Sequence, residues 1–241
     1  MSICRRLTTK DVALTAVFAA LYVVFSFLPL SPVIGLFGKA ITVATIIAPI
    51  IGIVLGSYLG VASTLSGGIV GVFFSPYFSP PGLVAGVITA LFAGLLYARR
   101  RSICIVVYLS FLLLFGFYPL VGPVWLYPPL MWFQIVGLLI LISPLQSLGI
   151  KNLNSNDNSR LLFAFFITFL TSTLAGQIAG SLTFETYVVG GADFFKVYWP
   201  LVTLAYPVER TIIALVAAFI GVALYKAVRS TNLAQVLTRT K

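Results

Sequence analysis

Two charged residues stand side by side in an apolar segment near the carboxyl end of the chain. Glu209 and Arg210 follow Pro207 and begin a long apolar run. An ionised side chain inside hydrocarbon costs roughly 2.5 to 3.5 kcal/mol even on lenient insertion scales, so both residues need partners or water. We expect Pro207 in the first helical turn, which would place Glu209 near the positive end of the helix dipole. The pair then either forms a salt bridge at a helix end or faces an outward-open cavity and holds a polar ligand.

A second group of polar and aromatic residues lies just before this pair, in residues 183 to 200. It holds two of the five acidic residues in the chain. Its charged members are Glu185, Asp193 and Lys196, and its aromatic members include Tyr187, Tyr198 and Trp199. We interpret the segment as a solvated outer loop with an aromatic anchor, because tryptophan and tyrosine gather at membrane boundaries. A ligand site in the same segment is the alternative.

Several kinds of chemistry are excluded by what the sequence lacks. The chain contains no histidine, which excludes His-ligated metal or haem and Ser-His-Asp hydrolysis. Residues 35 to 40 (GLFGKA) are similar to a phosphate-binding loop, but Val33 and Ala40 break the required pattern. We therefore expect no enzyme activity, no metal and no cofactor. The formal charge of +10 does not indicate a nucleic-acid partner, because the basic residues lie in short connections between apolar runs.

The composition predicts which elements must position these residues. The chain has 241 residues, of which 60% are hydrophobic and 8% are charged, and its mean hydropathy is +1.10. A soluble domain has roughly 45 to 50% apolar and about 25% charged residues. We therefore expect an all-α, polytopic transmembrane helical bundle that forms a single integral membrane domain over residues 1 to 241. The expected location is the cell membrane.

The apolar runs predict about eight spans, with six or seven as alternatives. They cover residues 11 to 28, 40 to 55, 58 to 74, 83 to 98, 102 to 121, 130 to 150, 161 to 182, and a last helix from about 207 to 229. Gly56 and Ser57 form a tight inner turn between the short second and third spans. Residues 29 to 39 and 75 to 82 are rich in turn-forming residues and predict outer connections, whereas the hydrophilic residues 151 to 160 predict an inner loop.

The basic residues predict the orientation of the bundle. On the eight-span interpretation twelve of the fifteen lie on the inner side: Arg5, Arg6, Lys10, Arg99, Arg100, Arg101, Lys151, Arg160, Lys226, Arg229, Arg239 and Lys241. Cytoplasmic loops of membrane proteins carry such an excess, so both termini are expected in the cytoplasm.

Small residues predict two places of close helix approach. Ala13, Ala16 and Ala20 share one face of the first helix, where they either pack within the chain or form a docking face for a partner subunit. Gln177 lies within residues 174 to 180 (LAGQIAG), and we expect interhelical packing as its role.

The order of these features resembles the substrate-binding (S) component of energy-coupling factor transporters. The resemblance covers residues 11 to 98 and 161 to 229, and residues 102 to 150 form an inserted helical pair. It is carried by the basic amino end before an alanine-rich helix, by residues 41 to 50 (ITVATIIAPI) and 55 to 62 (LGSYLGVA), by the break at Pro81 and Gly82, and by residues 206 to 215 (YPVERTIIAL).

The resemblance implies a six-helix core that captures a vitamin or related micronutrient from outside the cell. Such S components work with a membrane coupling subunit and two cytoplasmic ATPases, and the alanine face of the first helix would contact the coupling subunit. The ligand would lie in the outer half of the bundle, where charged residues would fix its polar groups and aromatic residues would stack on its ring. The implied ligand-binding residues are Lys39, Tyr77, Asp193, Lys196, Trp199, Glu209 and Arg210.

Two other functions remain open from the residues alone. The first is an ion-coupled secondary transporter or permease that uses Glu209 and Arg210 as a relay. The second is an accessory subunit of a membrane complex with no ligand of its own. A membrane lipid enzyme has the least support, because no carboxylate cluster or nucleophile and base pair is visible.

Overall fold

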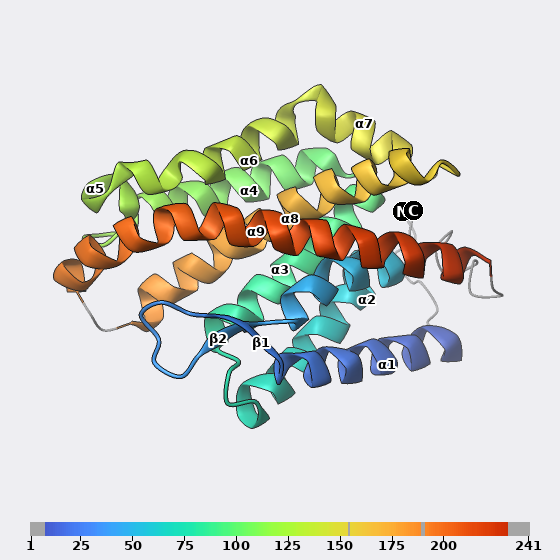
Figure 1. Cartoon of the computed structure of the whole chain (residues 1–241), viewed down its shortest axis with the longest axis horizontal. Coiled ribbons are helices and arrows are strands. Elements are labelled where there is room, and N and C mark those ends of the chain that lie inside the picture. The colour runs from blue at the N-terminus through green and yellow to red at the C-terminus, as the bar shows by residue number, and fades with distance from the viewer. Residues whose placement is uncertain (1–7, 154, 189–190, 231–241) are drawn as a thin grey trace.

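The computed structural model describes residues 8–153, 155–188 and 191–230, and this part of the chain is a bundle of long apolar helices (Figure 1). Most helices run along the longest axis of the molecule. The predicted helical membrane bundle is thereby confirmed, with one addition. A short two-stranded hairpin occupies the place of the predicted outer connection at residues 29 to 39.

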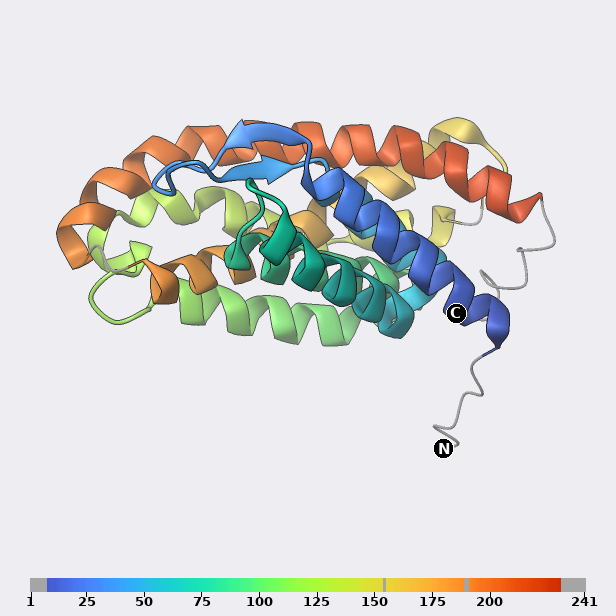
Figure 2. The ribbon, with the colours of Figure 1, turned by 90° about the horizontal axis from the view of Figure 1, so that it is seen from below.

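Helix α1, Thr9–Ser26, begins at a capping box in which Thr8 and Asp11 bond each other's backbone N–H groups. It buries Phe18 and Tyr22 against the bundle. The hairpin follows, with β1 at Pro29–Pro32 and β2 at Ala40–Thr42 in antiparallel pairing. It lies along one face of the bundle, as Figure 2 shows.

Helix α2, Ala44–Phe74, is bent sharply at Gly56, whose φ of 81° and ψ of 175° are accessible only to glycine. The two halves fold back on each other, because a Cβ atom on Gly60 would lie 3.1 Å from Cα of Gly52. Residues eight apart in a straight helix are about 12 Å apart. The predicted break at Gly56 is confirmed.

Helix α3, Pro80–Tyr97, lies between α2 and helix α8, Asn158–Tyr187, and these three elements form the centre of the core. Glycines let the backbones approach closely. A Cβ atom on Gly52 would lie 2.2 Å from the carbonyl oxygen of Ala90, and one on Gly176 would lie 2.4 Å from that of Ala85. Small residues serve the same purpose at helix contacts in other membrane proteins.

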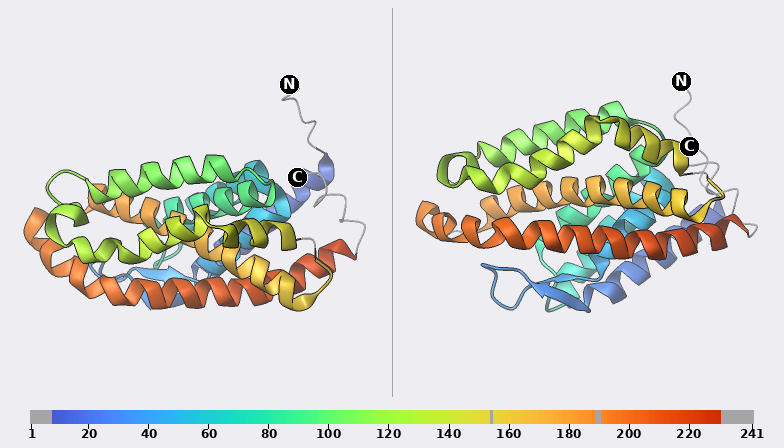
Figure 3. Two further views of the ribbon diagram at one scale, coloured as in Figure 1. Left: turned by 90° about the horizontal axis from the view of Figure 1, so that it is seen from above. Right: turned by 45° about the horizontal axis from the view of Figure 1, so that its top comes forward.

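A second layer lies against α8 and is made by residues 101 to 152 (Figure 3). Its elements are α4 (Arg101–Gly116), α5 (Pro123–Leu126), a 3-10 helix η1 (Pro128–Met131), α6 (Trp132–Ile142) and α7 (Pro144–Asn152). The expectation of one continuous span over residues 130 to 150 is wrong, because the chain bends by 62° between Ile142 and Pro144. Arg101 stabilises this bend with two hydrogen bonds. Its Nε donates to the Leu141 carbonyl at 2.7 Å, and its Nη2 donates to the Ser143 carbonyl at 3.0 Å.

The last helix, α9, runs from Gly191 to Arg229, and this overturns the predicted outer loop at residues 183 to 206. Pro207 therefore lies inside a helix rather than in its first turn, so Glu209 is not near the positive end of a helix dipole. A proline within a helix leaves the carbonyl four residues earlier without its usual donor. Here Trp132 Nε1 approaches that carbonyl, of Thr203, at 3.4 Å, and so compensates from another element.

Five described helices are long and apolar enough to cross a membrane: α1, α2, α3, α8 and α9. The bent pair of η1–α6 with α7 would add a sixth. The chain is thus a multi-pass membrane protein by its helices. The predicted eight spans also count the two halves of α2 separately and include α4, which has 16 residues.

The start of α1 and the end of α9 lie at the same end of the molecule, together with the starts of α4 and α8 (Figures 1 and 3). This arrangement agrees with the predicted grouping of basic residues at one side of the membrane. Arg5, Arg6, Arg239 and Lys241 lie outside the described residues. The number of crossings and the cytoplasmic orientation stay predictions.

Candidate ligand-binding site

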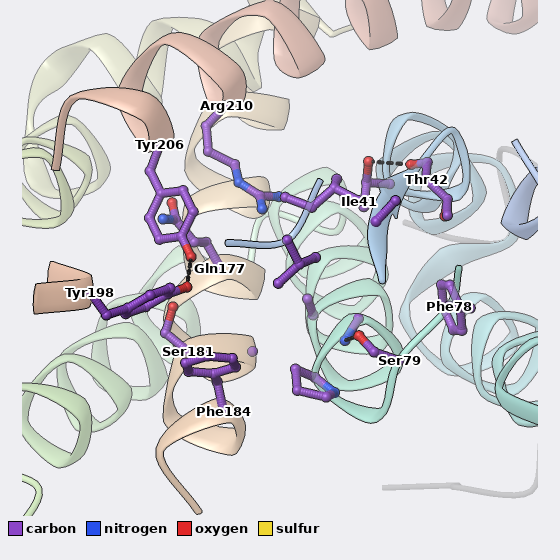
Figure 4. A pocket seen from close by; sticks show the side chains of 17 residues that line it. Ile41, Thr42, Phe78, Ser79, Gln177, Ser181, Phe184, Tyr198, Tyr206 and Arg210 are labelled. Atoms are coloured by element: carbon purple, nitrogen blue, oxygen red, sulfur yellow. Dashed lines mark hydrogen bonds between the residues drawn. The ribbon is translucent and has the colours of Figure 1, made fainter. Parts of the chain in front are cut away.

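A cavity of about 70 Å³ lies where the hairpin, the start of α3, and helices α8 and α9 meet (Figure 4). Apolar residues of the hairpin and α3 make much of its wall. Its polar lining consists of Thr42, Thr45, Ser79, Gln177, Ser181, Tyr198, Tyr206 and Arg210. No acidic side chain is among the residues that line it.

Arg210 projects from α9 into this cavity, toward Ile41 and Thr42 of the hairpin (Figure 4). Only 8% of its side chain is exposed, and its Nη2 lies 3.4 Å from Oε1 of Glu209. Its Nε has no hydrogen-bond partner among the described residues. The guanidinium is therefore incompletely satisfied in a buried position, where an unpaired donor is costly.

Gln177 reaches the same cavity from α8. It is 3% exposed, and neither Nε2 nor Oε1 has a hydrogen-bond partner among the described residues. The neighbouring Gly176 makes the close contact with α3, which leaves the Gln177 amide facing the cavity. Thr42 adds a third such group, since its buried Oγ1 also has no partner in the described part of the chain.

Aromatic residues close the cavity on the side of α9. The hydroxyl groups of Tyr198 and Tyr206 lie 2.5 Å apart. The Tyr198 ring stacks on both Phe184 and Phe194, at centroid distances of 4.9 and 5.6 Å, and those two rings lie 6.3 Å from each other. The hairpin loop rests on this stack at Gly35, where φ is +85° and a Cβ atom would lie 2.8 Å from the Phe194 ring. Glycine is thus required there for both its backbone conformation and its small size.

A larger and more open hollow of about 810 Å³ lies within the hairpin, beside the cavity, and is lined by hairpin residues and Tyr77. Val33 and Ala40 line both spaces, so they form the boundary between them. Lys39 and Tyr77 line the hollow and not the cavity. Lys39 Nζ donates to the Pro76 carbonyl at 3.1 Å, which joins the hairpin to the loop between α2 and α3.

The other implied ligand-binding residues lie elsewhere. Asp193 and Lys196 form an exposed pair at 3.0 Å on the first turns of α9, and neither lines the cavity or the hollow. Trp199 is fully buried, donates from Nε1 to the Val121 carbonyl at 2.9 Å, and packs edge-on against Phe115. Glu209 contacts Arg210 but is not part of the cavity wall.

Of the implied set, the structure places Arg210 at the cavity and Lys39 and Tyr77 together at the adjoining hollow. It also places at the cavity residues that the sequence did not indicate. Gln177, Ser181 and Phe184 line the cavity from α8. Their spacing of four and three residues places them on one helical face, and this spacing was the available signal. Tyr206 and Thr42 carry no comparable signal in the sequence.

No known protein family, curated protein or solved structure matches this chain. Within the described residues, no three His, Cys, Asp or Glu side chains are grouped so that they could hold a metal ion. The chemistry available to the cavity is thus that of a guanidinium, an amide and several hydroxyl groups beside apolar walls.

Proposed function

We propose that this chain is the substrate-capture subunit of an energy-coupling factor type importer and binds a small micronutrient in the cavity below the hairpin. The observation that carries the proposal is that the Arg210 Nε and the Gln177 amide, both in that cavity, have no hydrogen-bond partner in the described part of the chain. Lipid offers no hydrogen-bond partners, so buried polar groups of a membrane bundle are normally satisfied within the protein. A ligand that supplies the missing partners accounts for both.

The polar groups define the chemistry of the proposed ligand. Arg210 and the Gln177 Nε2 donate. Glu209 contacts Arg210 at Nη2 and leaves its Nε without a partner among the described residues, and no acidic side chain lines the wall. A carboxylate or a comparable anionic group would accept from both. The Gln177 Oε1 is an acceptor, so the ligand must also carry an N–H or O–H group close to its anionic group. The rings of Phe184 and Tyr206 would contact the apolar part of the ligand. A small vitamin-like carboxylate has these features.

Entry of such a ligand requires movement of the hairpin. The cavity of about 70 Å³ is smaller than the roughly 300 to 1,000 Å³ of typical ligand sites. Val33 and Ala40 separate the hollow of the hairpin from this cavity. Displacing these residues would join the two spaces and would let one end of the ligand reach Lys39 while its anionic end stays on Arg210.

The first helix supplies the proposed docking face for a membrane coupling subunit, which would work with two ATPase subunits. Ala13, Ala16 and Ala20 are all exposed, whereas the opposite side of α1 buries Phe18 and Tyr22. The alanine face is thus not used for packing among the described residues. Small residues on such a face would let a partner helix approach closely.

Mass spectrometry of the chain purified without partners tests the capture function. We expect a co-purifying small anionic compound, whose affinity Arg210→Gln and Gln177→Leu should each lower about 10- to 100-fold, the value of one hydrogen bond to a charged group. Lys196→Gln is the matched control, because it removes an exposed charge from the same helix as Arg210. Absence of any ligand, or unchanged affinity in both cavity variants, would reject the site.

A transport assay tests the docking face separately. Ala16→Trp combined with Ala20→Trp should abolish uptake by cells that express the partner subunits and should leave ligand binding intact. Equal loss of binding and uptake, or no loss of either, would reject docking through α1. Subunits that co-purify with a chain holding no ligand would favour the accessory role.

One observation favours an ion-coupled secondary transporter as the second candidate. Glu185 on α8 is 5% exposed, and neither carboxyl oxygen has a hydrogen-bond partner among the described residues. Such a buried carboxyl group in a membrane helix is typical of proton or cation pathways. Uptake into vesicles that lack any ATPase, driven by an ion gradient and abolished by Glu185→Gln, would establish this function instead.

A further inference from the structure

A third cavity lies between the start of α8 and the end of α9. These two helix ends lie at the opposite end of the bundle from the hairpin (Figure 3). Its volume is about 320 Å³. Lys226 and Arg229 line it from the last turn of α9, and Ser155 and Asn156 line it from the segment before α8. A hydrogen bond from Lys226 Nζ to Asn158 Oδ1 joins the two sides.

The charge of this cavity is positive. No acidic side chain is among the residues that line it. The acidic residue next to it in sequence, Asp157, caps α8 by accepting from Ser159 N at 3.0 Å and pairs with Arg160 at 3.5 Å. Lys226 and Arg229 make no ion pair with a described residue. Asp157 already caps the positive end of α8, so the attraction for an anion comes from Lys226 and Arg229, which have no ionic partner among the described residues.

The surroundings indicate that the anion belongs to a lipid. On the helical face that carries Lys226 and Arg229, the preceding turns of α9 expose Leu215 and Phe219. Helix α9 is long and apolar enough to cross the membrane. Acyl chains along this face would end at the level of Lys226 and Arg229. Basic pockets beside membrane helices commonly bind anionic headgroups. We propose that the cavity binds the phosphate group of an anionic phospholipid.

The proposed contacts are specific to the phosphate oxygens. The Arg229 guanidinium presents a planar fork suited to two oxygens of one phosphate, and Lys226 retains two N–H protons beyond the one that bonds Asn158. The Ser155 hydroxyl accepts from Asp157 N at 3.1 Å, so its proton is free to donate. The site is independent of the ligand cavity, because no residue lines both.

Thermal unfolding of the purified full chain tests the proposal. Phosphatidylglycerol added to the detergent-solubilised chain should raise the Tm, whereas phosphatidylcholine at equal concentration should not. Lys226→Gln with Arg229→Gln should lower the apparent phosphatidylglycerol affinity about 30-fold, as expected for two basic residues near an anionic lipid. Equal Tm values of variant and wild type in phosphatidylcholine would show that the variant still folds.

The control variant removes the same charge at the same end of the molecule. Lys151→Gln with Arg100→Gln changes two basic residues that do not line the cavity. It should retain the affinity for phosphatidylglycerol. Equal loss in the control, or no loss in the cavity variant, would overturn the site. Equal stabilisation by inorganic phosphate would also overturn it, because it would assign the cavity to a soluble ion.

Discussion

Replacement of Gly176 by alanine tests whether close contact between α3 and α8 holds the ligand cavity in shape. The new Cβ atom would lie 2.0 Å from Thr89 Oγ1 and 2.4 Å from the Ala85 carbonyl oxygen. Cβ contacts under 3.0 Å essentially never occur, and a backbone carbonyl cannot rotate away. The two helices must therefore separate by at least about 0.6 Å at this point.

The expected cost is measured best against a second glycine. A Cβ atom on Gly149, in α7, would have only ordinary contacts, the nearest being 3.6 Å away. Both substitutions gain about 0.5 to 1 kcal/mol of helix propensity, so the difference between the variants isolates the overpacking of about 1 to 3 kcal/mol. At about 2 to 4 °C per kcal/mol, Gly176→Ala should unfold roughly 2 to 12 °C below Gly149→Ala.

The assay is thermal unfolding of both variants in one detergent, followed by ligand affinity. Gly176→Ala should also weaken ligand binding, because Gln177 moves with α8. Adding Thr89→Ala should restore only part of the Tm, since the Ala85 carbonyl remains in place. A Tm for Gly176→Ala that equals that of Gly149→Ala would refute the reasoning, and full rescue by Thr89→Ala would show that the backbone contact is not limiting.

Three further predictions concern the frame that positions the site. Gly56→Ala should cost about 1 to 3 kcal/mol in unfolding free energy, because its φ and ψ belong to a region that only glycine adopts. Trp132→Phe should cost about 1 kcal/mol by leaving the Thr203 carbonyl unpaired, and adding Pro207→Ala should recover that loss in a double-mutant cycle. Arg101→Lys should lower the Tm by a few degrees, since lysine cannot replace the two bonds to the bend before α7.

Hydropathy and the positions of the glycines predicted the long helices and the break in α2. Lipid permits few kinds of backbone, so long apolar runs predict helices with little ambiguity. The break at Gly56 was visible because two short apolar runs meet at a glycine and a serine. The hairpin at residues 29 to 42 was expected only as a turn-rich connection, since its strands of four and three residues are too short to show a period.

The prolines of the last helix were misleading for a physical reason. Pro207 was expected in the first turn of the last helix, with residues up to 206 in an outer segment, yet both Pro200 and Pro207 lie inside α9. The donor that approaches the Thr203 carbonyl comes from Trp132, which is 71 residues away in the sequence. A local pattern carries no information about such a partner, so the helix could not be extended from sequence alone.

The same limit applies to the ligand site, where residue type was a weaker guide than burial. Asp193 and Lys196 form an exposed ion pair, and the Trp199 indole N–H donates a hydrogen bond to the Val121 carbonyl. None of the three therefore needs a ligand as a partner. Gln177 carries no charge and was expected to serve helix packing, yet its amide lies in the cavity with no hydrogen-bond partner among the residues that the structure describes. In a membrane bundle, the need for a partner identifies a site better than charge does. That need becomes visible only when the neighbours of each side chain are known, so the sequence alone could not separate Arg210 from Asp193, Lys196 and Trp199.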